Sequence, residues 1–224
     1  MSTLKPLVLY GSPVAPNPVK VAIVLKILNL PYTTTAIPIT EVKTPSYVAV
    51  NPNGRLPALE DPNTGIKVWE SGAIVEYIVD TYDKEHQLSF ERATKEDWEC
   101  KQWLHFQMSG QGPYYGQAMW FTRMADPPNP TALQRYQNEV KRVSGVLDNW
   151  LEGKEFLVGN KLTYVDLAFV PWQKAILPAM PKEYDAAKEF PNVEAWLQRL
   201  LVIDGVKKVY EERDALVKSP GFQK

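Results

Sequence analysis

Two short segments joined by a turn and followed by a helix place the strongest constraint on how this chain can fold. Residues 51–61 read Asn-Pro-Asn-Gly-Arg-Leu-Pro-Ala-Leu-Glu-Asp, and residues 69–78 read Trp-Glu-Ser-Gly-Ala-Ile-Val-Glu-Tyr-Ile. The pattern predicts turn, strand, turn, strand and then a helix. Because a residue before proline is held extended, Leu56 keeps its backbone N–H and C=O available to pair with an outside strand. We therefore expect a peptide-binding edge at Leu56.

The predicted helix after this strand pair begins with Glu70 and Ser71. The first N–H groups of a helix have no partner within the helix, and the positive end of the helix dipole favours a carboxylate there. The Glu70 carboxylate can in turn hold an ammonium group. The same short region therefore combines peptide-backbone pairing with features that recognise an amino-acid head group.

The periodicity of the chain changes after about residue 83. Residues 1–83 are expected to form an α/β layer of the thioredoxin type, because short strands alternate with helices and end in a hairpin. The strands are predicted at residues 6–10, 32–39, 56–60 and 67–69, and the helices at residues 18–28 and 71–82. A charged linker is expected at residues 84–92, and an all-helical domain at residues 93–224. In this second domain, Thr163 and Asp166 form a capping-box pattern that predicts a helix start.

Composition excludes several classes of function. The 224 residues include 25 Lys and Arg against 26 Asp and Glu, so the net charge of −1 disfavours nucleic-acid binding. No apolar run approaches a membrane span and no signal peptide is recognisable, so we expect a cytoplasmic protein without a membrane partner. A single cysteine, Cys100, excludes an intrachain disulfide, and His86 and His105 alone give no metal-ligand spacing. We expect Cys100 to be buried and inert.

Several separated motifs carry a resemblance to a known family. The segments at 51–61 and 69–78 resemble the glutathione site of the glutathione transferases. Residues 15–25 (Ala-Pro-Asn-Pro-Val-Lys-Val-Ala-Ile-Val-Leu), 109–117 and 161–172 resemble the fungal nu-class branch, which includes a nitrogen-regulator prion protein. The resemblance runs from about Leu7 to about Val209. It implies a thioredoxin-like glutathione-binding domain followed by the all-helical transferase domain, and a homodimer.

The resemblance assigns roles within the glutathione site. It implies that Leu56-Pro57 is the dipeptide with a cis proline and that Glu70 and Ser71 bind the γ-glutamyl group. Positively charged side chains nearby would meet a glutathione carboxylate. The expected glutathione-binding residues are Asn17, Lys43, Arg55, Leu56, Pro57, Glu70 and Ser71. Val42 stands where the prion relative has a histidine, a departure at the end of the site near Lys43.

Conjugation requires the glutathione thiolate, since the neutral thiol is a poor nucleophile. The donors that stabilise the thiolate should come from the loop after the first strand. Asn17 is the first candidate, Ser12 the second and Tyr10 the third. Helix capping before Pro18 is the alternative role of Asn17, and core packing is the more frequent role of a strand-end tyrosine such as Tyr10. Val14 occupies the position of the catalytic Ser or Cys of related classes, so their mechanisms do not transfer.

An aromatic set around flexible glycines in the helical domain is expected to hold the electrophile, because flat apolar ligands favour such surfaces. For each of these residues, core packing is the alternative. The candidates are Met108, Tyr114, Tyr115, Trp120, Phe121 and Trp172.

The sequence thus predicts a metal-independent transferase that conjugates glutathione, as co-substrate, to small apolar or aromatic electrophiles. Two alternatives remain at this stage. One is glutathione-dependent reduction of disulfides or organic peroxides, which uses the same thiolate. The other is a non-catalytic ligand-binding or regulatory protein that keeps the transferase fold.

Overall fold

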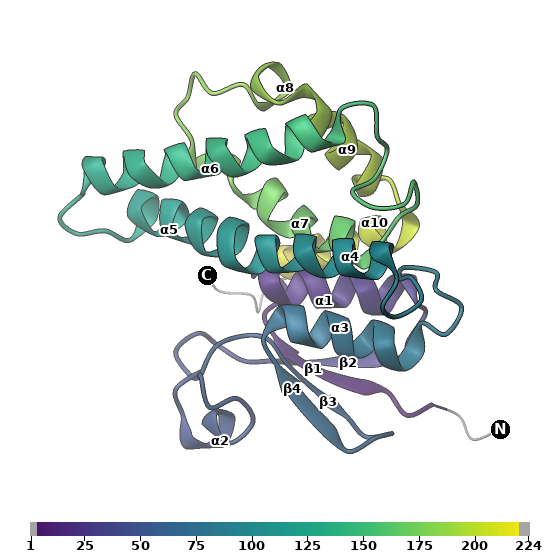
Figure 1. Ribbon diagram of the computed structural model, residues 1–224. Coiled ribbons are helices and arrows are strands. Elements are labelled where there is room, and N and C mark those ends of the chain that lie inside the picture. The colour runs from purple at the N-terminus through teal and green to yellow at the C-terminus, as the bar shows by residue number, and fades with distance from the viewer. Residues whose placement is uncertain (1–3, 220–224) are drawn as a thin grey trace. The chain divides into compact units, whose positions relative to one another are not determined.

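The computed structural model describes residues 4–219, which form two compact units (Figure 1). The first contains the chain up to Gln87 together with the segment from Val202 onward. The second runs from Leu88 to Leu201. None of the helices within the described residues is long and apolar enough to cross a membrane.

The first unit is built on a four-stranded sheet. Strand β1 (Leu7–Gly11) pairs parallel with β2 (Tyr32–Ala36) and antiparallel with β3 (Ala58–Asp61), which pairs antiparallel with β4 (Ile66–Trp69). The strand order is therefore β2-β1-β3-β4. This order confirms the predicted thioredoxin-like layer. The strands are close to their predicted positions, although Leu56 and Pro57 precede β3 instead of lying in it.

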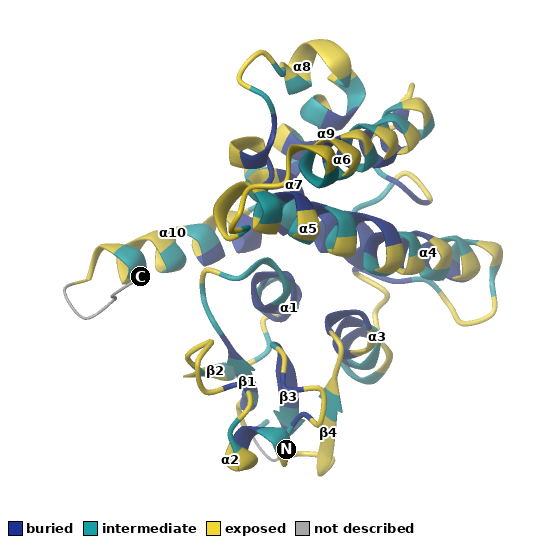
Figure 2. Ribbon diagram, turned by 90° about the vertical axis from the view of Figure 1, so that its left-hand side faces the viewer, coloured by how far each residue is buried: buried dark blue, intermediate teal, exposed yellow. Residues whose placement is uncertain are grey.

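Helices α1 (Pro16–Ile27) and α3 (Ser71–Tyr82) cover one face of the sheet, and the short α2 (Pro45–Val48) lies away from that face (Figure 1). Much of α1 is dark blue in Figure 2 because it is buried around most of its circumference. Its apolar side chains are therefore not confined to one stripe. Helix α3 begins and ends at the predicted residues.

The final helix, α10 (Asp204–Lys218), packs with the first unit, although the sequence placed residues 93–224 in one helical domain. Close approach explains the difference: a Cβ on Gly205 would lie 2.4 Å from Cγ1 of Ile27, at the end of α1. Only glycine lets the two helices meet at this distance. The domain boundary at residue 93 and the linker at 84–92 stay predictions, and residues 220–224 lie outside the described chain.

The second unit is helical throughout its described length. Its elements are α4 (Lys95–Phe106), the π-helical turn η1 (Gln107–Gln111), α5 (Gly112–Arg123), α6 (Pro130–Leu151), α7 (Tyr164–Ala175), the 3-10 turn η2 (Leu177–Ala179), α8 (Ala186–Glu189) and α9 (Pro191–Leu201). Helix α7 forms the centre, since residues 164–171 are all buried. The other long helices pack their apolar faces on it or on each other.

The predicted capping box starts α7. The Asp166 carboxylate accepts hydrogen bonds from Thr163 N at 2.9 Å and from Thr163 Oγ1 at 2.7 Å. It also accepts from Leu157 N at 2.9 Å and from Trp196 Nε1 at 3.0 Å. Because a buried carboxylate needs such donors, Asp166 fixes the start of α7 to a preceding loop and to α9.

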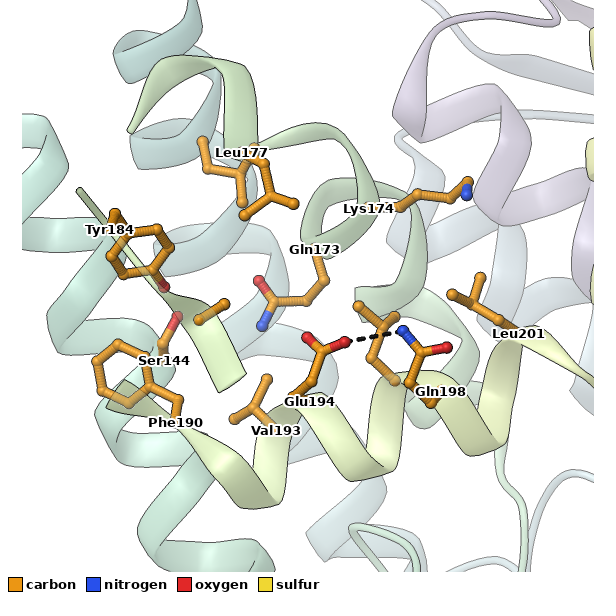
Figure 3. A pocket seen from close by; sticks show the side chains of 13 residues that line it. Ser144, Gln173, Lys174, Leu177, Tyr184, Phe190, Val193, Glu194, Gln198 and Leu201 are labelled. Carbon is orange, nitrogen blue, oxygen red and sulfur yellow. Dashed lines mark hydrogen bonds between the residues drawn. The ribbon is translucent and has the colours of Figure 1, made fainter. Parts of the chain in front are cut away.

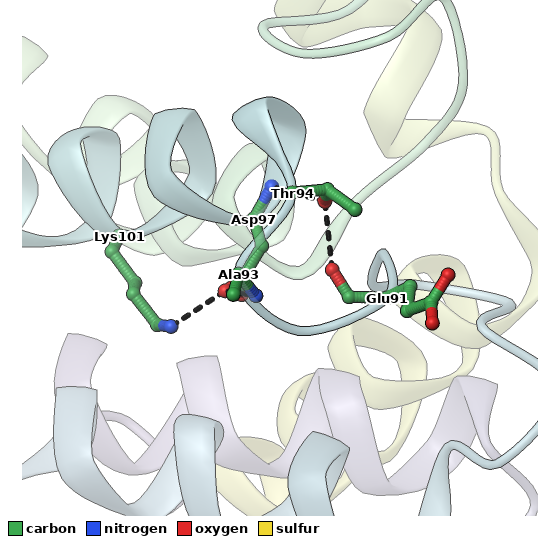
Figure 4. Close-up of polar contacts among 5 residues, drawn as sticks. All are labelled: Glu91, Ala93, Thr94, Asp97 and Lys101. Atoms are coloured by element: carbon green, nitrogen blue, oxygen red, sulfur yellow. Dashed lines mark hydrogen bonds and ion pairs between the residues drawn. The ribbon is translucent and has the colours of Figure 1, made fainter.

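A second cap starts α4 (Figure 4). Asp97 N donates to Thr94 Oγ1 at 3.3 Å, and the Asp97 carboxylate accepts from Ala93 N and from Lys101 Nζ at 2.9 and 2.7 Å. The Thr94 hydroxyl donates to the Glu91 carbonyl at 2.7 Å. These bonds satisfy donors at the helix start and place a carboxylate where the helix dipole favours it.

Candidate functional site

Three of the predicted site segments meet at one end of the sheet. Ala58 pairs with Tyr10 on one side and with Trp69 on the other. The chain leaves β1 just beyond Tyr10, enters β3 just before Ala58 and enters α3 just beyond Trp69. The register therefore brings the loop that follows β1, the Leu56-Pro57 dipeptide and the start of α3 to the same edge.

The loop before Pro57 is held by side chains that the sequence analysis did not assign. Asn51 Nδ2 and the Tyr47 hydroxyl both donate to the Arg55 carbonyl, at 2.7 and 2.8 Å. Gly54 has a φ of 56°, and a Cβ there would lie 2.6 Å from the Val42 carbonyl oxygen. These contacts fix the backbone that leads into Leu56. The peptide bond between Leu56 and Pro57 is cis, as the family resemblance implied.

Glu70 does not cap its own helix with its side chain. It is the N-cap residue of α3 with a φ of 70°, and its side chain makes no cap hydrogen bond. Its exposed carboxylate accepts a hydrogen bond from Asn53 Nδ2 at 3.4 Å, in the loop that precedes Leu56 and Pro57. The first backbone N–H groups of α3 begin directly after it. An ammonium and a carboxylate of one head group find complementary charges at these two places.

Lys20 is a site residue that the sequence reasoning missed. It is fully buried in α1, and its ammonium donates to Ser71 Oγ at 2.9 Å. Burial lowers the pKa of Lys20 to about 7, against the opposing effect of the nearby Glu70 charge. An ammonium below the first turn of α3 adds positive potential where a ligand carboxylate would bind. A lone lysine inside the apolar run of residues 19–25 was the signal available in the sequence.

The loop after β1 holds the candidates for thiolate stabilisation. Gly11 ends the strand so close to α1 that a Cβ there would lie 2.8 Å from Pro18 Cβ, which keeps the first turn of α1 near this edge. Ser12 follows in the loop. Asn17 is the second residue of α1, and the N-cap is Ala15. The alternative role of Asn17 as the cap is therefore wrong, because the helix starts earlier than predicted, at Pro16.

Tyr10 is engaged elsewhere. Its hydroxyl donates to Glu60 Oε2 at 3.1 Å. Tyr10 also lines a hollow of about 270 Å³ together with Ile37, Glu41, Thr44, Ser46, Tyr47 and Val50. Burial is the main cause that raises the pKa of Tyr10, and the Glu60 carboxylate adds to it. Strand alternation turns Tyr10 away from the face on which Leu9 packs. Its place as third candidate for thiolate stabilisation finds no support.

The two cationic candidates differ in their surroundings. Lys43 Nζ donates to the Asn53 carbonyl at 2.8 Å, so the side chain crosses the loop that precedes Pro57. The Arg55 side chain is exposed on the same loop, and the Arg55 carbonyl accepts the hydrogen bond from the Tyr47 hydroxyl. Both charges therefore lie beside the Leu56-Pro57 edge, where an extended peptide would end.

Comparisons with known proteins identify this arrangement. Residues 9–86 match the glutathione S-transferase N-terminal domain, and residues 113–203 match the glutathione S-transferase C-terminal domain. The chain belongs to the glutathione S-transferase family. The matched N-terminal region contains the whole edge described above.

Similarity to individual family members shows to which branch of the family the chain belongs. The glutathione S-transferase-like protein gedE of Aspergillus terreus is 48% identical, with 93% of this chain and 96% of gedE covered. The glutathione transferase URE2P6 of Phanerochaete chrysosporium, in complex with oxidized glutathione, has a TM-score of 0.91 and 44% identity over 94% of this chain and 97% of that one. Ure2p5 of the same fungus was cocrystallized with 1-(S-glutathionyl)-2,4-dinitrobenzene. It has a TM-score of 0.87 and 37% identity, with 99% of this chain and 100% of that one covered. The chain lies in the Ure2p-like fungal branch of the family.

The aromatic residues predicted for the electrophile pocket of this transferase-family chain separate into different places. Tyr115 is fully buried, and its hydroxyl lies 3.0 Å from Ser144 Oγ. Its assignment to the pocket is corrected, because helical spacing turns it into the contact between α5 and α6. Tyr114 and Phe121 instead pack beside Tyr136, with ring centroids 6.3 and 5.5 Å apart.

Of the remaining candidates, Met108 lies in η1, Trp120 in α5 and Trp172 in α7. Met108, Gly112, Gly116 and Trp120 are spaced four residues apart, and a Cβ on Gly116 would lie 3.3 Å from the Trp172 ring. The glycines let the Trp172 ring pack directly on this face. Trp120 at its end is 48% exposed. The π-helical turn η1, which carries Met108, interrupts the regular helix at the start of this face, as such turns often do at functional sites.

Two further predictions concern Cys100 and metal binding. Cys100 is buried, and desolvation raises the pKa of its thiol to about 12, so it is unreactive. Within residues 4–219, no group of three or more His, Cys, Asp or Glu side chains is arranged to hold a metal ion.

Proposed function

We propose that this protein is a glutathione transferase that joins the glutathione thiolate to small apolar electrophiles. The observation that carries the proposal is the convergence of the Leu56-Pro57 edge with the Glu70-Ser71 helix start, set by the pairing of Ala58 with Trp69. The backbone of Leu56 pairs with the cysteinyl residue of glutathione, while Glu70 and Ser71 hold the γ-glutamyl ammonium and carboxylate. Arg55 and Lys43 meet the glycyl carboxylate.

Asn17 and Ser12 are the residues proposed to stabilise the thiolate. A free thiol titrates near pH 8.5, and a decrease of about two units needs roughly 2.7 kcal/mol of preferential stabilisation of the anion. One or two amide or hydroxyl donors in a water-poor site supply energies of this size. The electrophile is proposed to lie on the face formed by Met108, Trp120 and Trp172.

The family relationship supports this reading, since Ure2p5 was cocrystallized with a dinitrobenzene conjugate of glutathione. The test is a parallel turnover assay with 1-chloro-2,4-dinitrobenzene, a small disulfide and cumene hydroperoxide. We expect conjugation to dominate. Turnover of only the disulfide or the peroxide would make the protein a reductase, and tight glutathione binding without any turnover would make it a ligand-binding or regulatory protein.

The glutathione site itself is tested by the double variant Glu70→Gln, Ser71→Ala. Each lost charge-assisted hydrogen bond is worth roughly 1.5–3 kcal/mol, so affinity should fall by more than about tenfold. Calorimetric titration with glutathione measures it. Unchanged affinity in the folded double variant would move the γ-glutamyl site elsewhere.

A further inference from the structure

The second unit contains a cavity whose lining residues have no part in the proposed glutathione site or electrophile face. Among them, Ser144 also contacts the buried Tyr115. The cavity has a volume of about 200 Å³ and lies among α6, α7, η2 and α9 (Figure 3). Seven of its thirteen lining residues are apolar, among them Ile176, Leu177, Phe190, Val193, Leu197 and Leu201. All of its lining residues belong to the second unit.

One polar side chain in this cavity has no partner in the protein. Gln173, on α7, is only 7% exposed, and its carboxamide makes no hydrogen bond to any residue within 4–219. Figure 3 shows the carboxamide directed into the cavity, between Leu177 and Glu194. The carboxamide is not sealed from water, so a ligand that displaces this water must supply a hydrogen bond in its place. Two other buried glutamines of this unit do have a partner, since Gln107 Nε2 donates to Gln111 Oε1 at 2.9 Å.

The other polar groups restrict the charge of an occupant. Lys174 and Glu194 both line the cavity, so neither sign of charge prevails. Glu194 already accepts a hydrogen bond from Gln198 Nε2 at 2.8 Å. Desolvation by burial raises the pKa of Tyr184, whose hydroxyl faces Ser144 in Figure 3, to about 12. An environment that disfavours a phenolate on Tyr184 also disfavours an anionic ligand.

The volume restricts the size of the occupant. A cavity of about 150 Å³ lined by apolar side chains is known to take up benzene, whereas drug-sized ligands occupy about 300–1,000 Å³. The space here fits a single substituted ring and is too small for a tripeptide such as glutathione. The Phe190 and Tyr184 rings offer aromatic faces to such a molecule.

We propose that this cavity is a second ligand site that binds a neutral, single-ring phenol, whose hydroxyl forms a hydrogen bond with the Gln173 carboxamide. The apolar walls bury the ring, and the amide selects molecules that carry the hydroxyl. A site built to hydrogen-bond a ligand hydroxyl rejects the analogue that lacks it, because the buried polar group is then left unpaired. The site is independent of the glutathione-binding residues.

The test uses 4-fluorophenol and its analogue 4-fluorotoluene, in which a methyl group replaces the hydroxyl. Their dissociation constants are measured by fluorine NMR on the full chain at pH 7. We expect the protein to bind the phenol about tenfold more tightly than the toluene, as for one buried hydrogen bond. Gln173→Met, which keeps the side-chain length, should abolish that preference. The matched control Gln134→Met, on the exposed surface of α6, should leave it unchanged.

A second variant keeps the test decisive if Gln173→Met fails to fold. Leu197→Phe enlarges a wall residue and should weaken binding of both compounds. Excess S-hexylglutathione should leave the affinity for 4-fluorophenol unaltered. Failure of the parent protein to bind 4-fluorophenol, an unchanged preference in folded Gln173→Met, or competition by S-hexylglutathione would each overturn the proposal. None of these outcomes depends on transferase activity.

Discussion

At the residue scale, two polar side chains of α1 define the chemistry proposed for the glutathione site. Asn17 lies in the first turn, beside the loop that follows β1. Lys20 lies one turn later, buried beneath Ser71. Asn17 is proposed to act on the sulfur, and Lys20 is proposed to set the charge where the γ-glutamyl carboxylate would bind. They can be tested separately.

Asn17→Asp should leave the protein folded, because an acidic residue is favourable in the first turn of a helix. The new carboxylate would repel the thiolate and raise the pKa of the bound glutathione thiol. We expect turnover of 1-chloro-2,4-dinitrobenzene at pH 7 to fall on the order of 10²-fold, as when one anion-stabilising donor is lost. The pH–rate profile should shift upward, and Asn17→Ser should be intermediate. Parent-like activity with an unshifted thiol titration would transfer the role to Ser12.

Lys20→Met should weaken binding of S-methylglutathione, which has no thiol to titrate. The ammonium is present below its pKa of about 7 and lost above it. At pH 6 we therefore expect roughly 3- to 10-fold weaker binding in the variant, as for one charge at a helix N-terminus. The difference between the two proteins should shrink by pH 8. Calorimetry at both pH values measures it, and a pH-independent difference would contradict the assignment.

Although Lys20→Met should weaken ligand binding at pH 6, it should raise the free energy of unfolding there. The pKa of Lys20 lies below its unfolded value of 10.5, so the unfolded chain binds more protons between pH 7 and 10.5 and this contribution makes stability rise with pH in that window. Below pH 7 the cost of the buried ammonium is fully present. Lys20→Met should therefore be more stable than the parent at pH 6, with the gain decreasing toward pH 10. Urea denaturation at the two pH values tests this.

At the scale of elements, the two helix caps of the second unit look alike in sequence and differ in burial. Thr163 and Asp166 start the central α7, and the carboxylate also ties down Leu157 and Trp196. Thr94 and Asp97 start α4, where Thr94 is half-buried and Asp97 is 8% exposed, against full burial of Thr163 and Asp166. Burial and the number of donors determine how much each cap contributes to stability.

Asp166→Ala should therefore destabilise the protein far more than Thr94→Ala. Removing Asp166 leaves buried donors without partners, each costing on the order of 1–3 kcal/mol. Loss of the Thr94 cap should cost about 1 kcal/mol. Chemical denaturation gives both values. Equal losses would mean that the α7 cap is no more than a local helix signal.

At the scale of the whole molecule, the structure assigns α10 to the first compact unit, and Gly205 is the contact that permits it. In Gly205→Ala, the added Cβ would overlap Ile27, and overpacking of this kind costs about 1–3 kcal/mol. Gly145→Ala is the matched control within α6, since its Cβ would lie an ordinary 3.6 Å from Phe190. The control should gain up to about 1 kcal/mol of helix propensity. A thermal unfolding scan measures both. If Gly205→Ala were as stable as Gly145→Ala, the close approach of Gly205 to Ile27 would not explain the position of α10.

The family relationship also underlies the proposal of a two-fold homodimer. We expect a dimer at micromolar protein concentration, because the resemblance implies it and closed two-fold dimers are the commonest oligomers. Sedimentation equilibrium decides the point, and a monomer mass at that concentration would contradict it.

The sequence alone determined the features that depend on neighbours along the chain. Turn residues, the proline after Leu56 and the spacing of apolar residues were sufficient for the sheet, for α3 and for the α7 cap. The family motifs then gave the cis proline and the edge that is proposed to bind glutathione. These signals are local, because backbone conformation and capping are decided within a few residues.

Only the tertiary structure decided which polar groups are buried and what they contact. Lys20 and Gln173 both lie in helices rich in apolar residues. The neighbouring residues indicate burial, but they do not show that Lys20 reaches Ser71 or that Gln173 faces a cavity. Tyr115 was assigned to a pocket and lies in the core, since adjacent helical residues differ by about 100° in direction. Likewise α10 joins the first unit through Gly205, a contact between segments far apart in the chain. Burial is a property of such distant contacts, and local sequence does not encode it.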